Sequence, residues 1–348
     1  MQTLIDRLFQ GERLTQKEFQ ALVLCEDQGA LELLFQRAKE RTEEVFGNHV
    51  YIRGLIEISS YCKQDCFYCG LRCSNKKAQR YRLSPEVILA TCEQGYEMGF
   101  RTFVLQGGED DFYTDEQMCD LIREICLSCP GSAVTLSFGE KSRRSYEAFR
   151  KAGASRYLLR HETATAEHFS RLHPPGQRLD SRMEALSALK ELGFQVGAGF
   201  MVGSPFQTAE HLAADLYFLQ EFRPHMVGIG PFIPHTDTPF GKYAAGDSQQ
   251  TVKMIAITRG ILPGALIPAT TALATLSQGS RLQALQAGAN VVMPNLSPNE
   301  VRVKYNLYNN KLSTGTESAQ MLEALRNELA GCGRKMDLSR GDSPLWKA

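Results

Sequence analysis

The sequence has no net charge, no long apolar run and no cluster of charges of one sign. Its 39 Lys and Arg residues balance 39 Asp and Glu residues, so neither a nucleic-acid partner nor a disordered acidic tail is indicated. No apolar stretch approaches the ~20 residues of a membrane span, and residues 1–7 lack the layout of a signal peptide. We therefore expect a cytoplasmic protein without a membrane partner, whose ten cysteines are metal ligands or buried thiols rather than disulfides.

Some catalytic and metal-binding patterns are also missing. No nucleotide P-loop and no hydrolase nucleophile elbow occurs. Cys126 and Cys129 form a CxxC pair, but no second pair is present to complete a zinc site. We interpret these two cysteines as buried thiols at a helix end, although the sequence does not decide whether they bind a metal.

Short apolar segments alternate with amphipathic ones along most of the chain. The predicted strands are 52–59, 102–106, 133–138, 156–160, 195–200, 226–230, 266–271 and 291–293. The predicted helices between them include 85–98, 114–126, 142–152, 178–192, 209–222, 249–262 and 280–287. Several of these helices end in a glycine that the next strand follows at once. Eight strand–helix units of roughly 30 residues predict a closed, parallel (β/α)8 barrel of the TIM type; an open doubly wound sheet is the alternative.

Helical segments are expected on both sides of the barrel. Residues 1–47 read as an N-terminal helical cap, with Leu24 on an apolar face and a capping box formed by Thr15 and Glu18. Residues 48–310 would form the barrel, and 311–348 a C-terminal helical extension. Within that extension we expect a helix at 316–331 and a frayed end from residue 339.

Three cysteines fall in one short loop after the first predicted strand. Cys62, Cys66 and Cys69 form CxxxCxxC, and the aromatic Tyr68 precedes the third cysteine. A structural zinc site requires four ligands, and an ordinary 4Fe–4S cluster is held by four cysteines. Three thiolates therefore suggest a cluster in which one iron is left open for a small molecule.

This loop resembles the signature of the radical S-adenosylmethionine (SAM) enzymes. The resemblance implies that SAM binds the open iron and is cleaved reductively to methionine and a 5′-deoxyadenosyl radical. A rival reading is that Cys73, four residues after Cys69, closes the cluster and makes the protein a non-catalytic electron carrier. The ferredoxin spacing is C-x2-C-x2-C-x3-C-P. Here the first gap has three residues and Ser74 follows Cys73, so we interpret Cys73 as a non-ligand.

Polar residues follow the other predicted strands, where a barrel of this type carries its active site. Gly107, Gly108 and Glu109 follow the second strand, and the two glycines would let the backbone approach a ligand closely. The third strand carries Thr135 and Ser137, and the fourth leads into Arg160-His-Glu162. Such a charged run at the end of an apolar strand needs partners, which are either an ion pair at the barrel rim or a bound ligand.

The motifs YCGLR, LQGGED, LLRHETA, GIGPFIPHTDTP, PATTA and VVMPN together resemble the HydE family of FeFe-hydrogenase maturases over about residues 1–310. The resemblance implies that Cys62, Cys66 and Cys69 hold a 4Fe–4S cluster. The residues that it implies for SAM binding are Tyr68, Gly107, Gly108, Glu109, Ser137, Glu162 and Arg182. The residues that it implies for a substrate and anion cavity are Thr135, Arg160, Thr270, Thr271, Met293, Tyr305 and Tyr308. By its residues alone, Arg182 would be read as a solvated helix position.

The family resemblance also implies a reaction and partners. The expected role is assembly of the dinuclear iron subcluster of the hydrogenase H-cluster, from an organometallic substrate supplied by the sister maturase HydG and passed to the scaffold HydF. Ferredoxin or flavodoxin is the expected electron donor. Many family members carry three further cysteines near the C-terminus, whereas here Cys332 stands alone, so no second cluster is expected. The alternative enzyme is a mutase or sulfur-chemistry enzyme acting on a free amino acid, similar to methylornithine synthase and biotin synthase.

Overall fold

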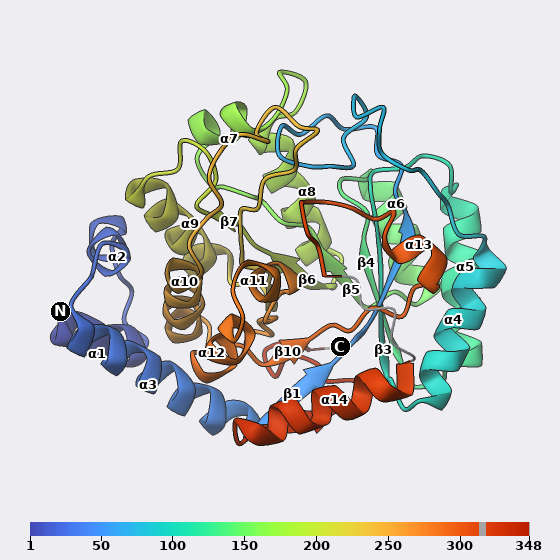
Figure 1. The fold of residues 1–348 in the computed structure, drawn as a ribbon. Coiled ribbons are helices and arrows are strands. Elements are labelled where there is room, and N and C mark those ends of the chain that lie inside the picture. The colour runs from blue at the N-terminus through green and yellow to red at the C-terminus, as the bar shows by residue number, and fades with distance from the viewer. Residues whose placement is uncertain (313–317, 348) are drawn as a thin grey trace.

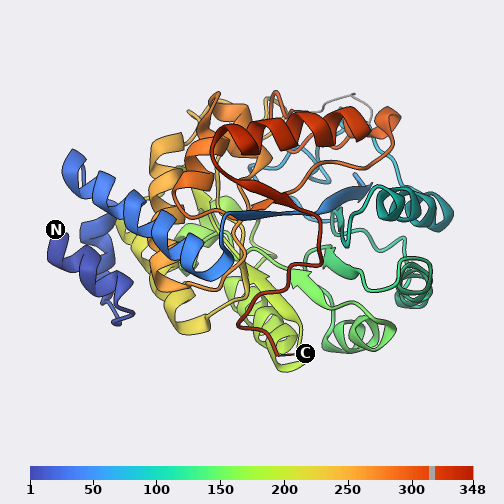
Figure 2. The same cartoon turned by 90° about the horizontal axis from the view of Figure 1, so that it is seen from below.

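Parallel β-strands form a barrel at the centre of the molecule, and helices surround it (Figures 1 and 2). The computed structural model describes residues 1–312 and 318–347. Six strands pair in the order β2-β3-β4-β5-β6-β8. They are β2 (Gly54–Ser59), β3 (Thr102–Gly107), β4 (Ala133–Ser137), β5 (Arg156–Leu158), β6 (Gln195–Ala198) and β8 (Met226–Val227).

Single parallel bridges continue the sheet from β8 back to β2. Met226 pairs with Leu266, Pro268 with Val291, and Asn295 with Leu55 of β2. Val291 belongs to β10 (Val291–Val292), which also pairs with β1 (His49–Ile52) immediately before β2. The predicted closed barrel is therefore confirmed, and an open doubly wound sheet does not describe it.

The seventh strand is much shorter than predicted. Instead of running over 266–271, it consists of bridges at Leu266 and Pro268, because Pro268 has no N–H to donate to a ladder. Thr270 already caps the next helix, where its hydroxyl oxygen accepts from the Leu273 N–H at 3.3 Å. By contrast, the fifth and sixth strands, β6 and β8, continue beyond a kink as β7 (Met201–Val202) and β9 (Gly230–Pro231). These two extensions pair with each other. At this kink a Cβ on Gly199 would overlap the Gly228 carbonyl oxygen.

The outer helices agree with the predicted segments to within about two residues at their ends. Those predicted are α4 (Pro85–Glu97), α5 (Asp115–Ser128), α6 (Arg143–Ala152), α8 (Leu179–Glu191), α9 (Ala209–Phe222), α10 (Ser248–Ile261) and α12 (Ser280–Gln286). Three short helices were not predicted: α7 (Ala166–Leu172), α11 (Thr271–Leu276) and α13 (Asn299–Arg302). These have four to seven residues, too few for a recognisable 3.6-residue period.

The N-terminal helices lie on the flank of the barrel (Figure 1). They are α1 (Gln2–Phe9), α2 (Gln16–Val23) and α3 (Gln28–Phe46), and they pack against α9 and α10. The capping box of Thr15 and Glu18 is confirmed. Leu24 was wrongly assigned to an apolar face, because α2 ends before it and its side chain is 61% exposed.

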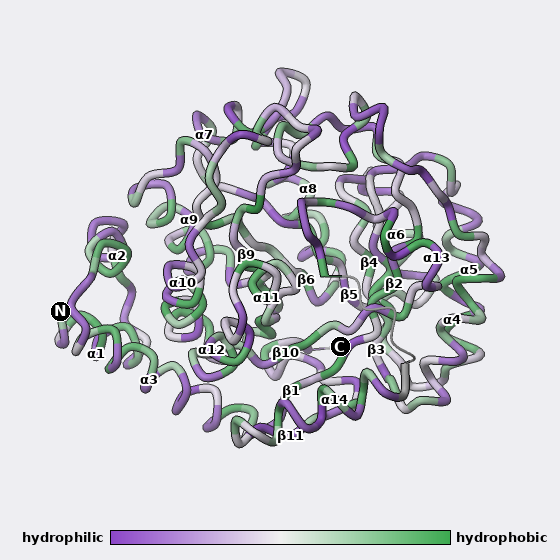
Figure 3. The backbone as a smooth tube through the Cα atoms, in the orientation of Figure 1, coloured by the Kyte–Doolittle hydropathy of each residue, from purple (hydrophilic) through white to green (hydrophobic). Residues whose placement is uncertain are grey.

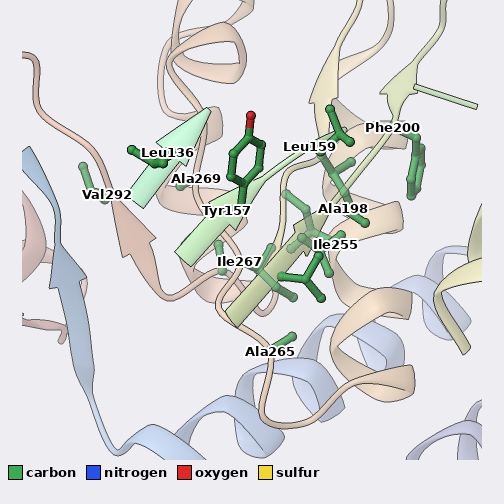
Figure 4. Packing of buried hydrophobic residues seen from close by; sticks show 14 of the residues in the cluster. Leu136, Tyr157, Leu159, Ala198, Phe200, Ile255, Ala265, Ile267, Ala269 and Val292 are labelled. Atoms are coloured by element: carbon green, nitrogen blue, oxygen red, sulfur yellow. The ribbon is translucent and has the colours of Figure 1, made fainter. Parts of the chain in front are cut away.

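The apolar core lies between the barrel and its helices. Side chains at the outward-facing strand positions, such as Leu136, Tyr157 and Ala198, pack in the same cluster as Ile255 of α10 (Figure 4). Figure 3 shows hydrophobic and hydrophilic stretches alternating along the outer helices. The opposite strand positions point into the lumen. The side chains of Arg53, Thr135 and Met293 line a small void there. The barrel interior is therefore partly polar.

The C-terminal tail is not frayed, contrary to the prediction. After α14 (Ser318–Gly331), β11 (Lys335–Asp337) pairs with β1, and the chain then crosses the barrel floor, where the strands begin. The predicted helix 316–331 starts at two residues that lie outside the described part of the chain. Ser343 is 2% exposed, and its hydroxyl donates to the Gly264 carbonyl at 2.8 Å.

Residues at the starts of three strands bind this tail. The Arg156 guanidinium, which is fully buried, lies 2.8 Å from an Asp342 carboxylate oxygen and donates to the Arg340 carbonyl at 2.6 Å. The Thr102 hydroxyl donates to the same carbonyl at 2.8 Å, and the side-chain Oε1 of Gln195 accepts from the Ser343 N–H at 2.9 Å. The tail thus neutralises a buried charge and closes the floor of the barrel.

We expect Asp342→Ala to lower the free energy of unfolding by about 1–3 kcal/mol, because a buried guanidinium would lose its carboxylate partner. Anaerobic urea unfolding followed by circular dichroism measures the change. Asp120→Ala is the control, since Asp120 pairs with Arg123 on the exposed face of α5 and such substitutions change stability by about 0.5 kcal/mol or less. A loss no larger than that of the control would contradict this role of the tail.

Candidate functional site

The loop that carries Cys62, Cys66 and Cys69 is held by backbone hydrogen bonds from three separate segments. The Lys63 N–H donates to the Glu109 carbonyl at 2.8 Å, the Phe67 N–H to Leu172 at 2.9 Å and the Gly70 N–H to Leu307 at 2.8 Å. Glu109 follows β3, Leu172 is the last residue of α7, and Leu307 follows α13. The loop therefore has a defined shape at the end of the barrel where the strands finish.

An internal ion pair gives the loop further rigidity. The Arg72 Nε donates to an Asp65 carboxylate oxygen at 2.7 Å, and Ser74 donates to the same carboxylate from both its N–H and its hydroxyl. These bonds hold the pKa of Asp65 well below its usual range. The Arg72 N–H also donates to the Cys69 carbonyl at 3.1 Å, so the charged pair is connected directly to the third cysteine.

The three thiols are partly or fully removed from water. Burial raises the pKa of Cys62 and Cys66, and it raises the pKa of Cys69 to about 12; neighbouring thiols add to the shifts of Cys66 and Cys69. The Arg182 guanidinium acts in the opposite direction on Cys66. Three clustered soft donors fit an iron–sulfur cluster, whose positive iron ions would stabilise the thiolates that burial alone disfavours. Among the described residues, no three His, Cys, Asp or Glu side chains are close enough together to hold one metal ion.

Of the remaining cysteines considered from the sequence, Cys126 and Cys129 lie apart from this loop, whereas Cys73 belongs to it and is near enough to Cys62 to contribute to its raised pKa. Cys73 is exposed at the outer end of the loop, where its N–H donates to the Gln64 carbonyl at 2.9 Å. Cys126 and Cys129 lie where α5 ends, close to the barrel floor. Cys129 is fully buried, and the Cys126 thiol faces the Gly153 carbonyl at 3.9 Å.

The two glycines at the end of β3 lie close to the cysteine loop and to the neighbouring strand. A Cβ on Gly108 would overlap the Tyr61 carbonyl oxygen and lie 2.7 Å from Cys62 Cβ. Glycine is thus required at position 108 because the cysteine loop crosses it closely. Gly107 ends β3 and lies beside Ser59 of the same sheet.

Two carboxylates and one guanidinium form a buried cluster beside the loop. Glu109 is 6% exposed and accepts from Gln64 Nε2 at 2.6 Å and from the Glu140 N–H at 3.1 Å. Arg182 donates from Nε to Glu140 at 2.6 Å and from Nη1 to the Arg160 carbonyl at 2.6 Å, and its Nη2 lies 4.0 Å from Glu109. Although burial acts to lower it, the pKa of Arg182 is raised by Glu140 and its neighbours. Arg182 is therefore a buried residue, not the solvated one that its local sequence suggests.

Glu162 has a strained backbone. Its φ of 66° lies in the left-handed region, which costs a non-glycine residue roughly 1–3 kcal/mol. Its N–H donates to the Gly199 carbonyl at 3.0 Å, and its carboxylate lies 2.9 Å from Arg160 Nη2 without hydrogen-bond geometry. The charged run at 160–162 was predicted to form an ion pair or to bind a ligand. The structure contains the ion pair between Arg160 and Glu162.

Two buried residues that sequence reasoning missed hold this strained turn in place. The His161 Nδ1 accepts from the Gly199 N–H at 3.2 Å, and its Nε2 lies 3.3 Å from the Asp215 carboxylate. Burial lowers the pKa of His161 to about 3, so the ring is neutral. The same Asp215 oxygen accepts from the Ala164 N–H at 2.5 Å. The residues on both sides of Glu162 are thus fixed to β6 and α9.

Tyr68 is also fixed through a histidine. Its hydroxyl lies 3.1 Å from His173 Nε2, and His173 Nδ1 lies 3.0 Å from the Phe169 carbonyl. Burial lowers the pKa of His173 to about 3, so the ring is neutral. Because a carbonyl can only accept, Nδ1 carries the proton and Nε2 accepts from Tyr68.

The predicted cavity residues lie in or around the barrel lumen. Thr270, Thr271 and Met293 line a cavity of about 420 Å³ that extends to α14. Thr135 and Met293 line the smaller void below it. The Thr135 hydroxyl and Arg160 Nε are buried without a hydrogen-bond partner among the described residues. These two donors are therefore free to bind a ligand.

The other predicted residues lie around the same space. Tyr305 is 2% exposed, and its hydroxyl oxygen accepts from Gln106 Nε2 at 3.3 Å. Tyr308 hydrogen-bonds to Thr275, and burial raises its pKa to about 12. Ser137 is half-buried at the end of β4, in register with Gln106.

A buried ion pair in the large cavity was not predicted. Glu57, which is 1% exposed, lies 2.5 Å from Lys311 Nζ and accepts from Asn295 Nδ2 at 2.8 Å. Burial raises the pKa of Glu57, while Lys311 opposes that shift. The sequence contained one signal, since Glu57 is the single acid in an otherwise apolar strand. Nothing in the local sequence marked Lys311 as its partner.

We expect Cys66→Ser to abolish assembly of a stable cluster, whereas Cys73→Ser keeps the iron content and the EPR signal of the dithionite-reduced, reconstituted protein. The reason is that Cys66 is half-buried and interacts with both other loop thiols, while Cys73 is exposed. Iron analysis and EPR spectroscopy measure both properties. Loss of the cluster in Cys73→Ser would instead identify Cys73 as a fourth ligand, as the electron-carrier reading requires.

Comparisons with known proteins show which family this chain is similar to. A sequence model of the radical SAM superfamily matches residues 56–219. The [FeFe] hydrogenase maturase subunit HydE of Thermotoga maritima is 44% identical over 329 residues, which cover 93% of this chain and 94% of that protein. The 3-methylornithine synthase of Methanosarcina acetivorans is 30% identical over 82% of this chain and 81% of its own.

Solved structures give the same fold. The structure of methylornithine synthase (PylB) superposes with a TM-score of 0.83 at 27% identity and covers 96% of this chain and 97% of its own. That of the maturase HydG superposes with a TM-score of 0.81 over 97% of this chain and 76% of its own, at 22% identity, and is evidence for the fold alone. With the three-cysteine loop at the end of a closed barrel and a relative this similar over nearly its full length, the chain belongs to the radical SAM superfamily and, within it, to the HydE family of [FeFe]-hydrogenase maturases.

Proposed function

We propose that this radical SAM enzyme acts in assembly of the dinuclear iron subcluster of the [FeFe]-hydrogenase H-cluster. The observation that carries the proposal is the 44% identity to HydE over almost the whole chain, including the strands and loops that build the lumen. The family's cofactors are a 4Fe–4S cluster and SAM. When bound and reduced, the cluster supplies the electron that cleaves SAM.

We propose Cys62, Cys66 and Cys69 as the cluster ligands. The three thiols lie on one rigid loop, and Arg182 places a positive charge near Cys66. The carboxylates of Glu109 and Glu162 would attract the cationic parts of SAM, and Arg182 would bind its carboxylate, because a guanidinium can donate two parallel bonds. Tyr68, Gly107, Gly108 and Ser137 complete the proposed SAM site around the loop.

The substrate would bind deeper in the lumen. The unpartnered donors of Thr135 and Arg160 suit an anionic or strongly polarised ligand. Thr270, Thr271, Met293, Tyr305 and Tyr308 would form the rest of that site. Because the surrounding walls are buried, the substrate would be held close to SAM and away from bulk water.

The partners of the family are part of the proposal. We expect the organometallic substrate to come from HydG, the product to pass to HydF, and a ferredoxin or flavodoxin to supply electrons. In the described residues no helix is long and apolar enough to cross a membrane. A second candidate, mutase chemistry on a free amino acid, is favoured by one specific observation, the TM-score of 0.83 to methylornithine synthase.

Two anaerobic assays test the proposal. Reconstituted protein incubated with dithionite and SAM is expected to form 5′-deoxyadenosine. Apo-hydrogenase incubated with HydG, HydF and this protein should become active, and should stay inactive when this protein is omitted. Formation of 5′-deoxyadenosine without any activation of hydrogenase would reject the maturase role, and formation of methylornithine from a free amino acid would identify the alternative.

We expect Asp215→Ala to weaken SAM binding to the holoenzyme about 10-fold, because the turn that holds Glu162 would relax; a tenfold loss equals about 1.4 kcal/mol, within the strain range of roughly 1–3 kcal/mol for such a backbone. Asp215→Asn keeps an acceptor oxygen and should retain most of the affinity. Equilibrium dialysis with the oxidised holoenzyme measures both.

The control for this experiment is Asp342→Ala, which removes a carboxylate from the barrel floor and should leave SAM affinity unchanged. Equal losses in Asp215→Ala and Asp342→Ala would mean that general destabilisation, not the position of Glu162, explains the result.

A further inference from the structure

A glutamine amide lies against one of the three loop thiols. Gln177 Oε1 is 3.5 Å from Cys66 Sγ. The other end of the same amide, Nε2, is buried and has no hydrogen-bond partner among the described residues. An unpaired buried N–H group costs free energy, so this arrangement leaves a donor unused directly beside a sulfur atom.

The segment that carries Gln177 is anchored to the cysteine loop. The Leu172 carbonyl accepts from the Phe67 N–H at 2.9 Å, and His173 accepts from the Tyr68 hydroxyl. A turn follows, in which the Gln177 N–H donates to the Pro174 carbonyl at 3.0 Å. Phe67 and Tyr68 directly follow Cys66 in the chain, and Leu172 and His173 lie a few residues before Gln177. Gln177 is therefore held at the sulfur by its surroundings.

The orientation of the amide depends on the protonation of Cys66. A neutral thiol can donate its S–H to Oε1, as it does in this structure. A thiolate has no proton and can only accept. Rotation of the side-chain amide by 180° exchanges Oε1 and Nε2 at nearly the same positions. With a thiolate, this rotation would place an N–H at the sulfur and also satisfy the unpaired donor.

We infer that Gln177 donates an N–H···S hydrogen bond to the Cys66 thiolate when the cluster is bound, and thereby raises the reduction potential of that cluster. The inference rests on the proposed function, since it requires Cys66 to be a cluster ligand. Reduction adds negative charge to the cluster and its sulfurs, so a donor at a sulfur stabilises the reduced form more than the oxidised form. Gln177 is thus a positioning and tuning residue that need not contact SAM.

A redox titration followed by EPR spectroscopy tests this on full-length, reconstituted protein without SAM. Gln177→Leu removes the donor, and we expect the midpoint potential to shift to a more negative value than in the wild type. Gln177→Glu keeps the shape but replaces the donor with an acceptor, and we expect a larger negative shift. Iron content, and the amplitude of the EPR signal once the cluster is fully reduced, should be unchanged.

Gln207→Leu is the matched control. Gln207 is a half-buried amide after β7, near the same end of the barrel, but its Oε1 accepts from the Gly203 N–H and its Nε2 donates to the Met201 carbonyl, away from the cysteine thiols. Its removal should leave the potential at the wild-type value. A second readout is pulsed EPR of the reduced cluster in protein labelled with [15N]glutamine, in which a nitrogen coupling should be present in the wild type and absent in Gln177→Leu.

The possible outcomes separate this inference from the proposed function. A wild-type protein that assembles no cluster would overturn the proposed function, and the inference with it. A normal cluster whose potential is the same in Gln177→Leu as in the wild type, or that shows no nitrogen coupling in the wild type, would overturn the inference alone. Loss of the cluster in both Gln177 variants would also overturn it, because Gln177 would then only support the loop.

Discussion

The site depends on backbone hydrogen bonds that fix a long loop at the carboxyl ends of the barrel strands. Cys62, Cys66 and Cys69 are not on a helix or strand, and their relative positions come from the Glu109, Leu172 and Leu307 carbonyls, which accept from the loop. Since these carbonyls belong to three distant parts of the chain, folding of the whole barrel is needed before the thiols come together. A closed barrel is thus a requirement for the metal site as well as its container.

The charged groups above and inside the lumen are arranged differently. Beside the loop, Glu109 and Glu140 surround Arg182, so the buried guanidinium there is already neutralised. Deeper in the lumen, the Arg160 Nε and the Thr135 hydroxyl are buried and have no hydrogen-bond partner among the described residues. The region beside the cysteine loop is therefore suited to a ligand that carries positive charge. The deeper part of the lumen is suited to a ligand that accepts hydrogen bonds. Two ligands of different charge could be held close together in this way without exchanging sites.

The sequence predicted the barrel because its signals are local: apolar strands, amphipathic helices and glycines at helix ends recur at a regular spacing. The cysteine loop was also recognisable, because its three cysteines lie within eight residues. The contacts that no local pattern encodes were missed. Glu57 and Lys311 are 254 positions apart, Gln177 belongs to a turn without a regular period, and the tail at 339–347 has no apolar stripe. Its order comes from buried polar groups such as Arg156, which become visible only when the strand starts are assembled.

The tail that closes the barrel floor has a consequence for the order of catalytic events. With Asp342 and Ser343 bound to the strand starts, nothing can pass through that end of the lumen without first displacing them. Small molecules can then enter and leave the lumen only at the end of the barrel that carries the cysteine loop. A nucleoside bound at that entrance would obstruct the way in for anything that must sit beneath it. Loading is therefore expected to be sequential, with the deeper molecule arriving first and leaving last.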